Sequence, residues 1–211
     1  MKYDIKKYKA IVFDFDGVIL DSEQFKIATF KSLFTEYPNH LEAIDSYNKQ
    51  NRGISRYEKF AHIFKNILDV PYTEETGKEL GKKYSNILSQ NLAATPLIEG
   101  VNEFLIQQSA LLFIASSSEV HEMEIVLQTK GMTAYFVKLY GHPILKAEAI
   151  TKTMEEYHLE PSQLLFFGDA IADWKVAHET NVNFIARTEN PELFPTDTNN
   201  ISTFLELLVQ G

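Results

Sequence analysis

The chain lacks several features that would place it in common functional classes. It contains no cysteine, so it can form neither a disulfide nor a thiolate metal site. It has no block rich in lysine and arginine, and its formal net charge is −9 at pH 7, so we expect no nucleic-acid partner. No segment approaches the roughly 18 consecutive apolar residues of a membrane helix, and residues 10–13 are too short for a signal-peptide core. We therefore expect a cytoplasmic protein with no membrane partner.

Short apolar runs alternate with segments of helical periodicity. The candidate strands are continuous apolar runs, which are typical of parallel strands covered on both faces, at 9–14, 110–115 and 164–167, with shorter ones at 134–138 and 182–186. Helical patterns lie near 99–108, 119–130, 146–157 and 171–180. This alternation predicts an α/β fold, a Rossmann-like parallel sheet with helices on both faces. Such folds bind ligands at the carboxyl ends of their strands.

One interval interrupts the alternation. From about Ser22 to Pro96 the pattern is helical and contains no convincing strand. One helix is predicted to begin at Ser55, where residues 55–58 fit a capping box. Further helices are expected at 73–92 and within 24–48. With 211 residues and 45% hydrophobic composition, the chain can supply a core and a smaller module. We predict an α/β core domain of residues 1–21 and 97–211 and a helical cap domain of residues 22–96.

Two carboxylates interrupt the first apolar segment, Ala10-Ile11-Val12-Phe13-Asp14-Phe15-Asp16-Gly17. Residues i and i+2 of a strand point the same way, so Asp14 and Asp16 are expected to face one site. Close carboxylates repel each other, and a bound Mg²⁺ removes that penalty. An aspartate can also act as a nucleophile. The simpler interpretation is an Asp-Gly turn that closes a strand. Taken alone, the pair supports both interpretations.

Three later features add polar groups at the same predicted edge of the sheet. Ser116 follows an apolar strand, and its hydroxyl can bind a phosphate oxygen or cap a helix. Asp169 and Asp173 follow another strand, where they can share a helix face or serve as ordinary N-terminal acids of that helix. Lys146 opens a helix, where a lysine is more often a solvated surface residue. Together these residues predict a functional site, because a chance coincidence of carboxylates, a hydroxyl and an amine at one edge of the sheet is improbable.

At these residues the sequence resembles the haloacid dehalogenase-like superfamily, and within it the β-phosphoglucomutase and phosphoglycolate phosphatase-like members. The resemblance covers nearly the whole core, in the family's order. It rests on Asp-x-Asp-Gly after the first strand, a serine after a second strand, a lysine near a later helix and Gly-Asp-x-x-x-Asp after a further strand: Asp14, Asp16, Gly17, Ser116, Lys146, Gly168, Asp169 and Asp173. The family also implies a helical cap inserted after the first motif.

The resemblance implies a Mg²⁺-dependent phosphatase that hydrolyses a small phosphorylated metabolite through an aspartyl phosphate. Asp14 would be the nucleophile, and Asp16 would protonate the leaving oxygen and then activate water. The implied metal ligands are the Asp14 carboxylate, the Asp16 backbone carbonyl and Asp169, with Asp173 in support. Ser116 and Lys146 would bind the phosphoryl oxygens. Gly17 and Ser117 are assigned to substrate binding. An aspartate at position 16 argues against dehalogenation, because a halide needs no proton.

Two departures from the family pattern affect this interpretation. Many members place the lysine directly before a proline, where this chain has His142, so His142 remains an alternative to Lys146. The related sugar phosphomutases carry a histidine where Lys26 aligns, and an acidic pair where this chain has Gly168-Asp169. Both mutase features are absent, which favours a phosphatase and keeps a β-phosphoglucomutase-like activity as the alternative.

The segment Arg52-Gly53-Ile54-Ser55-Arg56 suggests how the cap contributes to specificity. It resembles the Gly-x-Ser-Arg segment in the cap of β-phosphoglucomutase-like members. A cation at a helix start opposes the helix dipole, and a bound anion would resolve that conflict. We therefore expect Arg56, with Arg52 or Lys59, to bind a second anionic group of the substrate. A solvated helix start is the alternative interpretation.

A function from another class is a phospho-accepting signalling domain of the receiver type. Receivers also combine strand-end carboxylates, a hydroxyl, a lysine and Mg²⁺ on an α/β sheet. Their acceptor aspartate follows a middle strand, however, and they lack a long helical insertion. Many turnovers in an assay would identify an enzyme. The sequence leaves the physiological substrate and the oligomeric state open.

Overall fold

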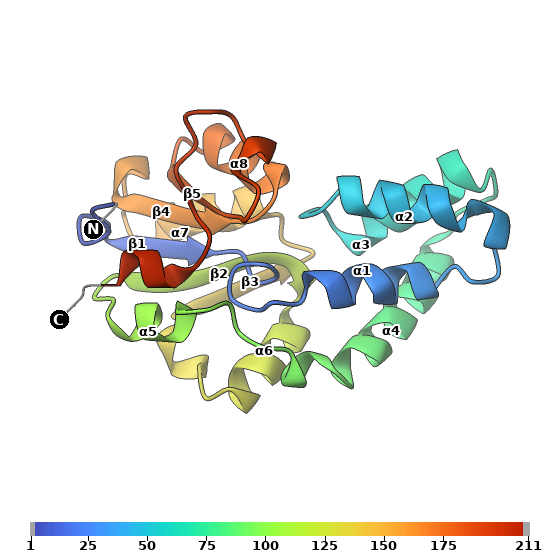
Figure 1. Ribbon diagram of the computed structural model, residues 1–211, viewed down its shortest axis with the longest axis horizontal. Helices are drawn as coiled ribbons and strands as arrows, with labels where there is room; N and C mark the ends of the chain where they lie inside the picture. The colour runs from blue at the N-terminus through green and yellow to red at the C-terminus, as the bar shows by residue number, and fades with distance from the viewer. Residues whose placement is uncertain (1–2, 209–211) are drawn as a thin grey trace.

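The computed structural model describes residues 3–208, which contain a six-stranded parallel sheet (Figure 1). The strand order is β3-β2-β1-β4-β5-β6, so the first strand lies at the centre, as a doubly wound fold requires. The strands are β1 (Ala10–Phe13), β2 (Leu111–Glu119), β3 (Lys138–His142), β4 (Leu164–Gly168), β5 (Asn183–Arg187) and β6 (Asn200–Ile201). In the central register Phe13 pairs with Ile114 and Phe167, so these strands end side by side.

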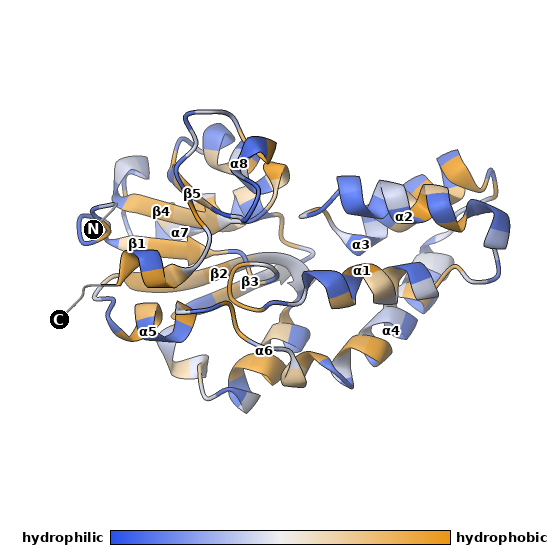
Figure 2. Cartoon of the chain, in the orientation of Figure 1, coloured by the Kyte–Doolittle hydropathy of each residue, from blue (hydrophilic) through white to orange (hydrophobic). Residues whose placement is uncertain are grey.

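Helices cover both faces of the sheet, which confirms the predicted α/β class. They are α5 (Val101–Ile106), α6 (Val120–Thr129), α7 (Lys146–Glu156) and α8 (Ile171–Glu179). Alternate residues of β1 point to opposite faces: Phe13 belongs to the hydrophobic cluster of α5 and α6, and Val12 to that of α7 and α8. Figure 2 shows the resulting apolar strands between amphipathic helices. Short 3₁₀ segments complete this part at Thr133–Tyr135, Pro161–Gln163, Pro191–Leu193 and Phe204–Leu207.

The interval from 22 to 96 is helical, and within the described chain no strand lies in it. It contains α1 (Glu23–Ser32), α2 (Leu41–Gln50), α3 (Arg56–His62), α4 (Glu74–Ser89), a π segment at Ile63–Ile67 and 3₁₀ turns at Pro38–His40 and Leu92–Ala94. Ser55 is the N-cap of α3, as predicted, because its hydroxyl accepts a hydrogen bond from Tyr57 N–H at 3.3 Å; this bond replaces the one that a capping box would make with Glu58 N–H. The interior of this helical region is aromatic, and the rings of Phe30 and Phe60 stack with their centroids 5.3 Å apart. This helical region lies beyond the carboxyl ends of the strands (Figure 1).

The two connections to the helical region run side by side. Leu20 and Leu97 form an antiparallel bridge. On either side of it, Asp21 N–H donates to the Pro96 carbonyl at 2.9 Å, and Ile98 N–H donates to the Ile19 carbonyl at 3.0 Å. The division into an α/β core and a cap with boundaries at 21/22 and 96/97 stays a prediction. Below, "cap" denotes residues 22–96.

Two strand predictions differ from the structure. The run 134–138 was expected to be a strand, but Thr133–Tyr135 is a 3₁₀ turn and β3 begins at Lys138. The segment is apolar because Tyr135 and Phe136 pack against the core before the strand starts. β2 continues to Glu119, four residues beyond the predicted end. Its pairing with β3 shifts register between Ala115 and Glu119, so the three serines lie in an irregular stretch before Glu119 pairs with His142. Among residues 3–208, no helix is both long and apolar enough to cross a membrane.

Candidate active site

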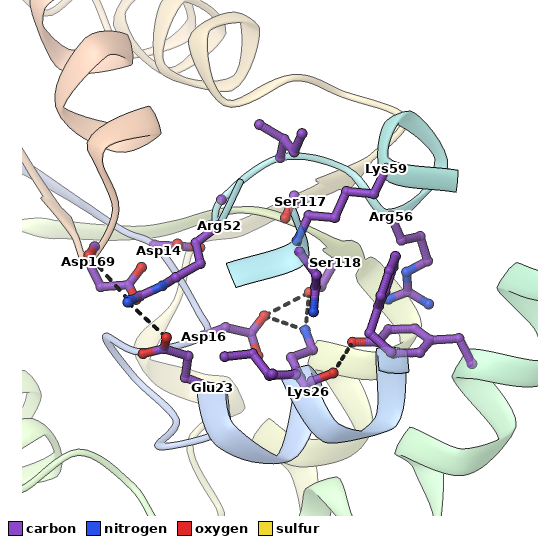
Figure 3. A pocket seen from close by; sticks show the side chains of 16 residues that line it. Asp14, Asp16, Glu23, Lys26, Arg52, Arg56, Lys59, Ser117, Ser118 and Asp169 are labelled. Atoms are coloured by element: carbon purple, nitrogen blue, oxygen red, sulfur yellow. Dashed lines mark hydrogen bonds and ion pairs between the residues drawn. The ribbon is translucent and has the colours of Figure 1, made fainter. Parts of the chain in front are cut away.

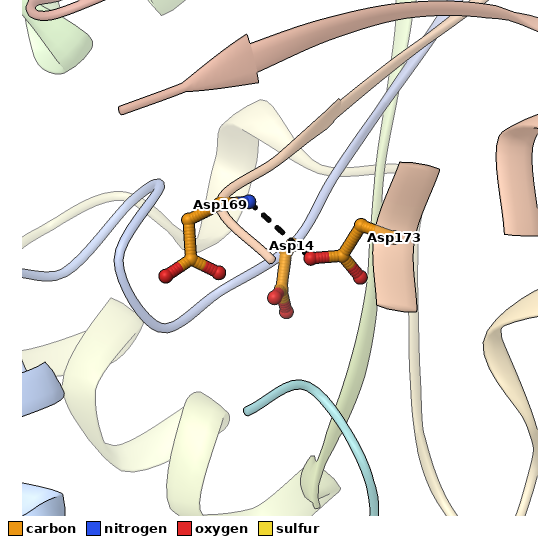
Figure 4. A group of neighbouring side chains, drawn as sticks. All are labelled: Asp14, Asp169 and Asp173. Carbon is orange, nitrogen blue, oxygen red and sulfur yellow. Dashed lines mark hydrogen bonds between the residues drawn. The ribbon is translucent and has the colours of Figure 1, made fainter. Parts of the chain in front are cut away.

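Four predicted site residues meet at the carboxyl edge of the central strands. Asp14 directly follows β1, and Asp169 directly follows the neighbouring strand β4. Asp173 lies in the first turn of α8, and Lys146 is the first residue of α7. Figure 4 shows the three carboxylates converging from the strand ends and the helix start. The parallel register of β1 and β4 therefore brings together residues that are far apart in the sequence.

Lys146 connects two of these carboxylates. Its ammonium donates to Asp14 Oδ2 at 2.8 Å and to Asp173 Oδ1 at 2.5 Å. All three side chains are almost fully buried. The other Asp14 oxygen accepts the backbone N–H of Phe15 at 2.7 Å, which fixes the carboxylate orientation. The carboxylates of Asp14 and Asp173 hold the pKa of Lys146 above its usual value although burial opposes this, so the lysine stays charged.

Two glycines permit the close packing of this cluster. Gly17 has a φ of +76°, and a Cβ placed there would lie 2.3 Å from Asp169 Oδ2. A Cβ on Gly168 would lie 2.3 Å from the Cβ of Asp173. The predicted substrate-binding role of Gly17 stays a prediction, but its absence of a side chain clearly makes room for Asp169.

The electrostatics of the cluster favour a bound cation. Burial raises the pKa of Asp14 to about 7. The charge of Lys146 opposes this rise, and repulsion from Asp173 and Asp16 adds to it. Burial, together with the charge of Asp14, raises the pKa of Asp169 to about 6. The pKa of Asp173 is also raised by burial. A divalent cation would remove this repulsion and keep the carboxylates ionised.

Asp14, Asp169 and Asp173 form a donor set that fits Mg²⁺. Each offers one carboxylate oxygen, and these atoms lie within 4.8 Å of one another. Hard oxygen donors are those that Mg²⁺ prefers. The Asp16 carboxylate is not part of this group and faces elsewhere, and its predicted contribution through the backbone carbonyl stays a prediction.

The Asp16 carboxylate is held by residues of both parts of the protein. Lys26 of α1 donates to Asp16 Oδ2 at 2.6 Å, and the hydroxyl of Ser118 donates to the same oxygen at 2.8 Å. Ser22 Oγ donates to Oδ1 at 2.5 Å. Burial favours a higher pKa, but Lys26 and the two hydroxyls together hold the pKa of Asp16 below its usual value. Asp16 is therefore ionised in this conformation.

Ser118 is a site residue that the sequence analysis missed. The signal was present, because three serines follow the apolar run, but the strand was predicted to end at Ala115, and its register becomes irregular beyond that residue. Ser116 is 2% exposed, and its hydroxyl accepts the Ser118 N–H at 3.2 Å. Ser117 and Ser118 line the pocket over the carboxylates, whereas Ser116 does not. The proposed contact of Ser116 with a phosphoryl group stays a prediction.

The cap closes this pocket with four cationic side chains, drawn in Figure 3. Arg52 pairs with the Asp169 carboxylate, and its guanidinium also lies 2.8 Å from Glu23. Arg56 forms two parallel hydrogen bonds to Glu122 of α6, at 2.8 and 2.6 Å. Because this carboxylate already neutralises Arg56, the geometry is unfavourable to the prediction that Arg56 binds a second substrate anion. Lys26 and Lys59 are the remaining two cations.

His142 and Lys146 occupy different places, which bears on the alternative between them. The His142 ring packs against Tyr57 of the cap with centroids 4.5 Å apart, and its Nδ1 lies 3.5 Å from Ser55 Oγ. Lys146, in contrast, contacts Asp14 directly. The structure therefore favours Lys146 as the cation beside the predicted nucleophile.

Comparisons with known proteins agree with this arrangement. A family model described as haloacid dehalogenase-like hydrolase matches residues 11–187. A phosphoglycolate phosphatase from Synechococcus elongatus is 25% identical over 185 residues, which cover 85% of this chain and 84% of that protein. Among solved structures, a protein from Bacteroides fragilis described as a haloacid dehalogenase-like hydrolase superposes with a TM-score of 0.76 at 21% identity, covering 95% of this chain and all of that one. A hydrolase of the same family from Bacillus subtilis, solved bound to magnesium, gives 0.67 at 21% identity, covering 95% and 96% of the two chains.

Proposed function

The chain belongs to the haloacid dehalogenase-like hydrolases, and on that premise we propose that it is a Mg²⁺-dependent phosphatase of a small phosphorylated metabolite. The observation that carries the proposal is the buried contact of Asp14 with Lys146, beside a triad of carboxylates suited to Mg²⁺. The relative from Synechococcus elongatus, named a phosphoglycolate phosphatase, supports a phosphoric monoester as the substrate class.

In this proposal Asp14 is the nucleophile. A carboxylate oxygen attacks phosphorus, the bond to the leaving oxygen breaks, and an aspartyl phosphate forms. The bond from Phe15 N–H to Oδ1 and the ammonium on Oδ2 orient the carboxylate before attack. Lys146 can also bind a phosphoryl oxygen, where its fixed positive charge stabilises the charge that develops. Ser117 or Ser118 would supply hydroxyl donors from the pocket wall.

Asp14, Asp169 and Asp173 would hold the Mg²⁺, which supplies positive charge to the phosphoryl oxygens when bound. The cap residue Arg52 contacts Asp169 in the present conformation, so cap position and metal site are linked. We also propose that residues 22–96 act as a cap domain that excludes water from the pocket during attack.

Asp16 moves the protons in this scheme. Held ionised by Lys26 and two hydroxyls, it is in the form that takes a proton from water during hydrolysis of the aspartyl phosphate. The leaving oxygen of the first step must receive a proton, which Asp16 can give only in its protonated form. The Asp16 carboxylate left by that transfer takes a proton from the attacking water in the second step, which regenerates the protonated form, so one proton cycles through Asp16 in each turnover.

The alternative within the family is a β-phosphoglucomutase-like sugar phosphomutase. Lys26 occupies the place of the mutases' histidine and contacts Asp16, which favours transfer to water over transfer to a second sugar hydroxyl. Membership of a hydrolase family and the helical insertion speak against a receiver-like signalling role.

A panel of phosphorylated sugars, nucleotides and small acids, assayed for phosphate release with and without Mg²⁺, tests the proposal. We expect multiple turnovers that require Mg²⁺, and a loss of at least about a thousandfold in Asp14→Asn, because removing the nucleophile removes the covalent step. Asp197→Asn, in an exposed loop, is the matched control and should retain turnover. Interconversion of glucose 1-phosphate without phosphate release would favour the mutase. Undiminished turnover in Asp14→Asn would refute the mechanism.

A further inference from the structure

We propose that Lys59 and Asn48 form an anion-binding subsite that selects phosphomonoesters carrying a second negative group away from the phosphoryl end. This inference rests on the proposed phosphatase function and specifies its substrate class. It differs from the prediction made from the sequence, in which Arg56 had the leading part.

The first observation is the pairing of the cations around the pocket. Among the described residues, Lys26 pairs with Asp16, Arg52 with Asp169 and Glu23, and Arg56 with Glu122. Of the four cations that line the pocket, Lys59 is the one that has no carboxylate partner among residues 3–208. Its partners in the described chain are neutral: it donates to Asn48 Oδ1 at 3.0 Å and lies 5.5 Å from the centre of the Phe30 ring. One cation at the pocket is therefore available to a ligand.

The second observation is that the surroundings of Lys59 disfavour its charge when no ligand is bound. Figure 3 shows its side chain extending from α3 into the pocket. Burial lowers the pKa of Lys59 to about 8, and three further cations around the pocket, Lys26, Arg52 and Arg56, lower it too. The charge of Asp16 acts in the opposite direction on the pKa of Lys59, but Lys26 already neutralises Asp16. A ligand anion beside Lys59 Nζ would offset both the desolvation and the repulsion.

Asn48 provides a second donor beside this cation. It lies on α2 and is 3% exposed, and its Oδ1 accepts from Lys59, which fixes the orientation of the amide. Within residues 3–208, no acceptor bonds its Nδ2, and Asn48 is one of the residues that line the pocket. An ammonium and an amide N–H held together present two donors to one carboxylate or phosphate group.

The pocket limits the size of such a ligand. Its lining includes Asp14 and Asp169 of the core together with Lys59 and Asn48 of the cap. The cavity measures about 90 Å³. At roughly 10–15 Å³ per water on this scale, it holds on the order of six to nine waters. The matching ligand is thus a short phosphomonoester whose second anion, a carboxylate or a phosphate, is a few bonds from the ester oxygen.

Matched substrates test the subsite. Phosphoglycolate and ethyl phosphate differ by a carboxylate at the far end, and ethylene glycol bisphosphate replaces the carboxylate by a phosphate. We expect the wild type to prefer the doubly anionic esters in kcat/KM by about 10- to 100-fold, the size of one charge-assisted contact. Comparison of the two anionic esters identifies which anion fits.

Two variants remove the subsite by different routes. Lys59→Met deletes the charge at similar length, and Asn48→Asp gives Lys59 the carboxylate partner it lacks. Both should reduce the preference to about threefold or less, mainly through KM for the anionic esters. The control Lys82→Met, on the exposed side of α4, should keep the wild-type preference. Because the two substitutions perturb packing differently, folding failure of one leaves the other as a test.

The outcomes separate the two proposals. Hydrolysis of no ester by the wild type would overturn the proposed function and the subsite with it. Turnover with equal kcat/KM for ethyl phosphate and both anionic esters would overturn the subsite alone. A preference that persists in Lys59→Met or in Asn48→Asp would also overturn the assignment, because another residue would then hold the anion.

Discussion

The pair between Arg56 of the cap and Glu122 of the core allows a quantitative prediction. The Arg56 and Glu122 side chains are 6% and 3% exposed, and two hydrogen bonds of 2.8 and 2.6 Å join them. Ser85 Oγ adds a third bond to Glu122 at 2.6 Å. Removing one partner of such a buried pair leaves an uncompensated charge, which costs about 3–5 kcal/mol. We expect Glu122→Gln or Arg56→Met to lower the free energy of unfolding by that amount.

The double variant is the sharper measurement. Arg56→Met with Glu122→Met removes both charges and fills the space with apolar groups, so its cost should fall well below the sum of the single variants. Urea unfolding followed by far-UV circular dichroism gives all four free energies. The exposed pair Lys138–Glu156 is the control, and Glu156→Gln should cost less than about 1 kcal/mol.

Two results would refute this reasoning. Additive losses in the double variant would mean that the two side chains do not depend on each other. An Arg56→Ala variant with unchanged stability and a raised KM for anionic esters would mean that Arg56 binds substrate, as the sequence suggested.

The pKa of Glu122 also fixes how the stabilisation by this pair depends on pH. Burial favours a higher pKa for Glu122, but Arg56 depresses it. The pair's contribution therefore persists above the ordinary glutamate range and is lost as the pH falls through the depressed pKa.

Two further predictions concern the metal and the pH. Chelation with EDTA should abolish turnover, and added Mg²⁺ should restore it. Mg²⁺ should also raise the thermal unfolding midpoint of the wild type but not that of Asp169→Asn. A wild-type midpoint that Mg²⁺ leaves unchanged would contradict the assigned ligands. Because Lys59 is charged only below its pKa of about 8, the preference for phosphoglycolate over ethyl phosphate should be complete near pH 6.5 and fall as the pH rises through 8. Burial of Lys59, together with the charges of Lys26, Arg52, Arg56 and Asp16 that face it, sets this pKa. The preference of Lys59→Met should show no such decline, and a pH-independent preference in the wild type would contradict the prediction.

The α/β core could be predicted from the sequence because its signals are local. Continuous apolar runs marked β1, β2 and β4, and the polar residues that follow them identified the edge where Asp14, Lys146, Asp169 and Asp173 meet. Parallel pairing alone brings such strand ends together, so no knowledge of side-chain contacts was needed.

Contacts between the cap and the core could not be predicted in the same way. Nothing near Arg56 in the sequence indicates that Glu122, 66 residues away, neutralises it. For the same reason the sequence analysis placed Lys26 only by its alignment with the mutases' histidine and gave no sign of its contacts with Asp16 and Ser118. Charge patterns within one segment show which side chains are present, and only the docking of two segments decides which of them are already paired.

The bridge between Leu20 and Leu97 has a topological consequence. Since the polypeptide leaves and rejoins the sheet at adjacent points, the 75 or so intervening residues form a side excursion that no strand order depends on. A different excursion, longer or shorter, can be grafted at this junction without rethreading the sheet. The reactive carboxylates would then stay where they are while the wall that recognises the rest of the substrate is exchanged, so chemistry and selectivity can diversify independently in such a scaffold.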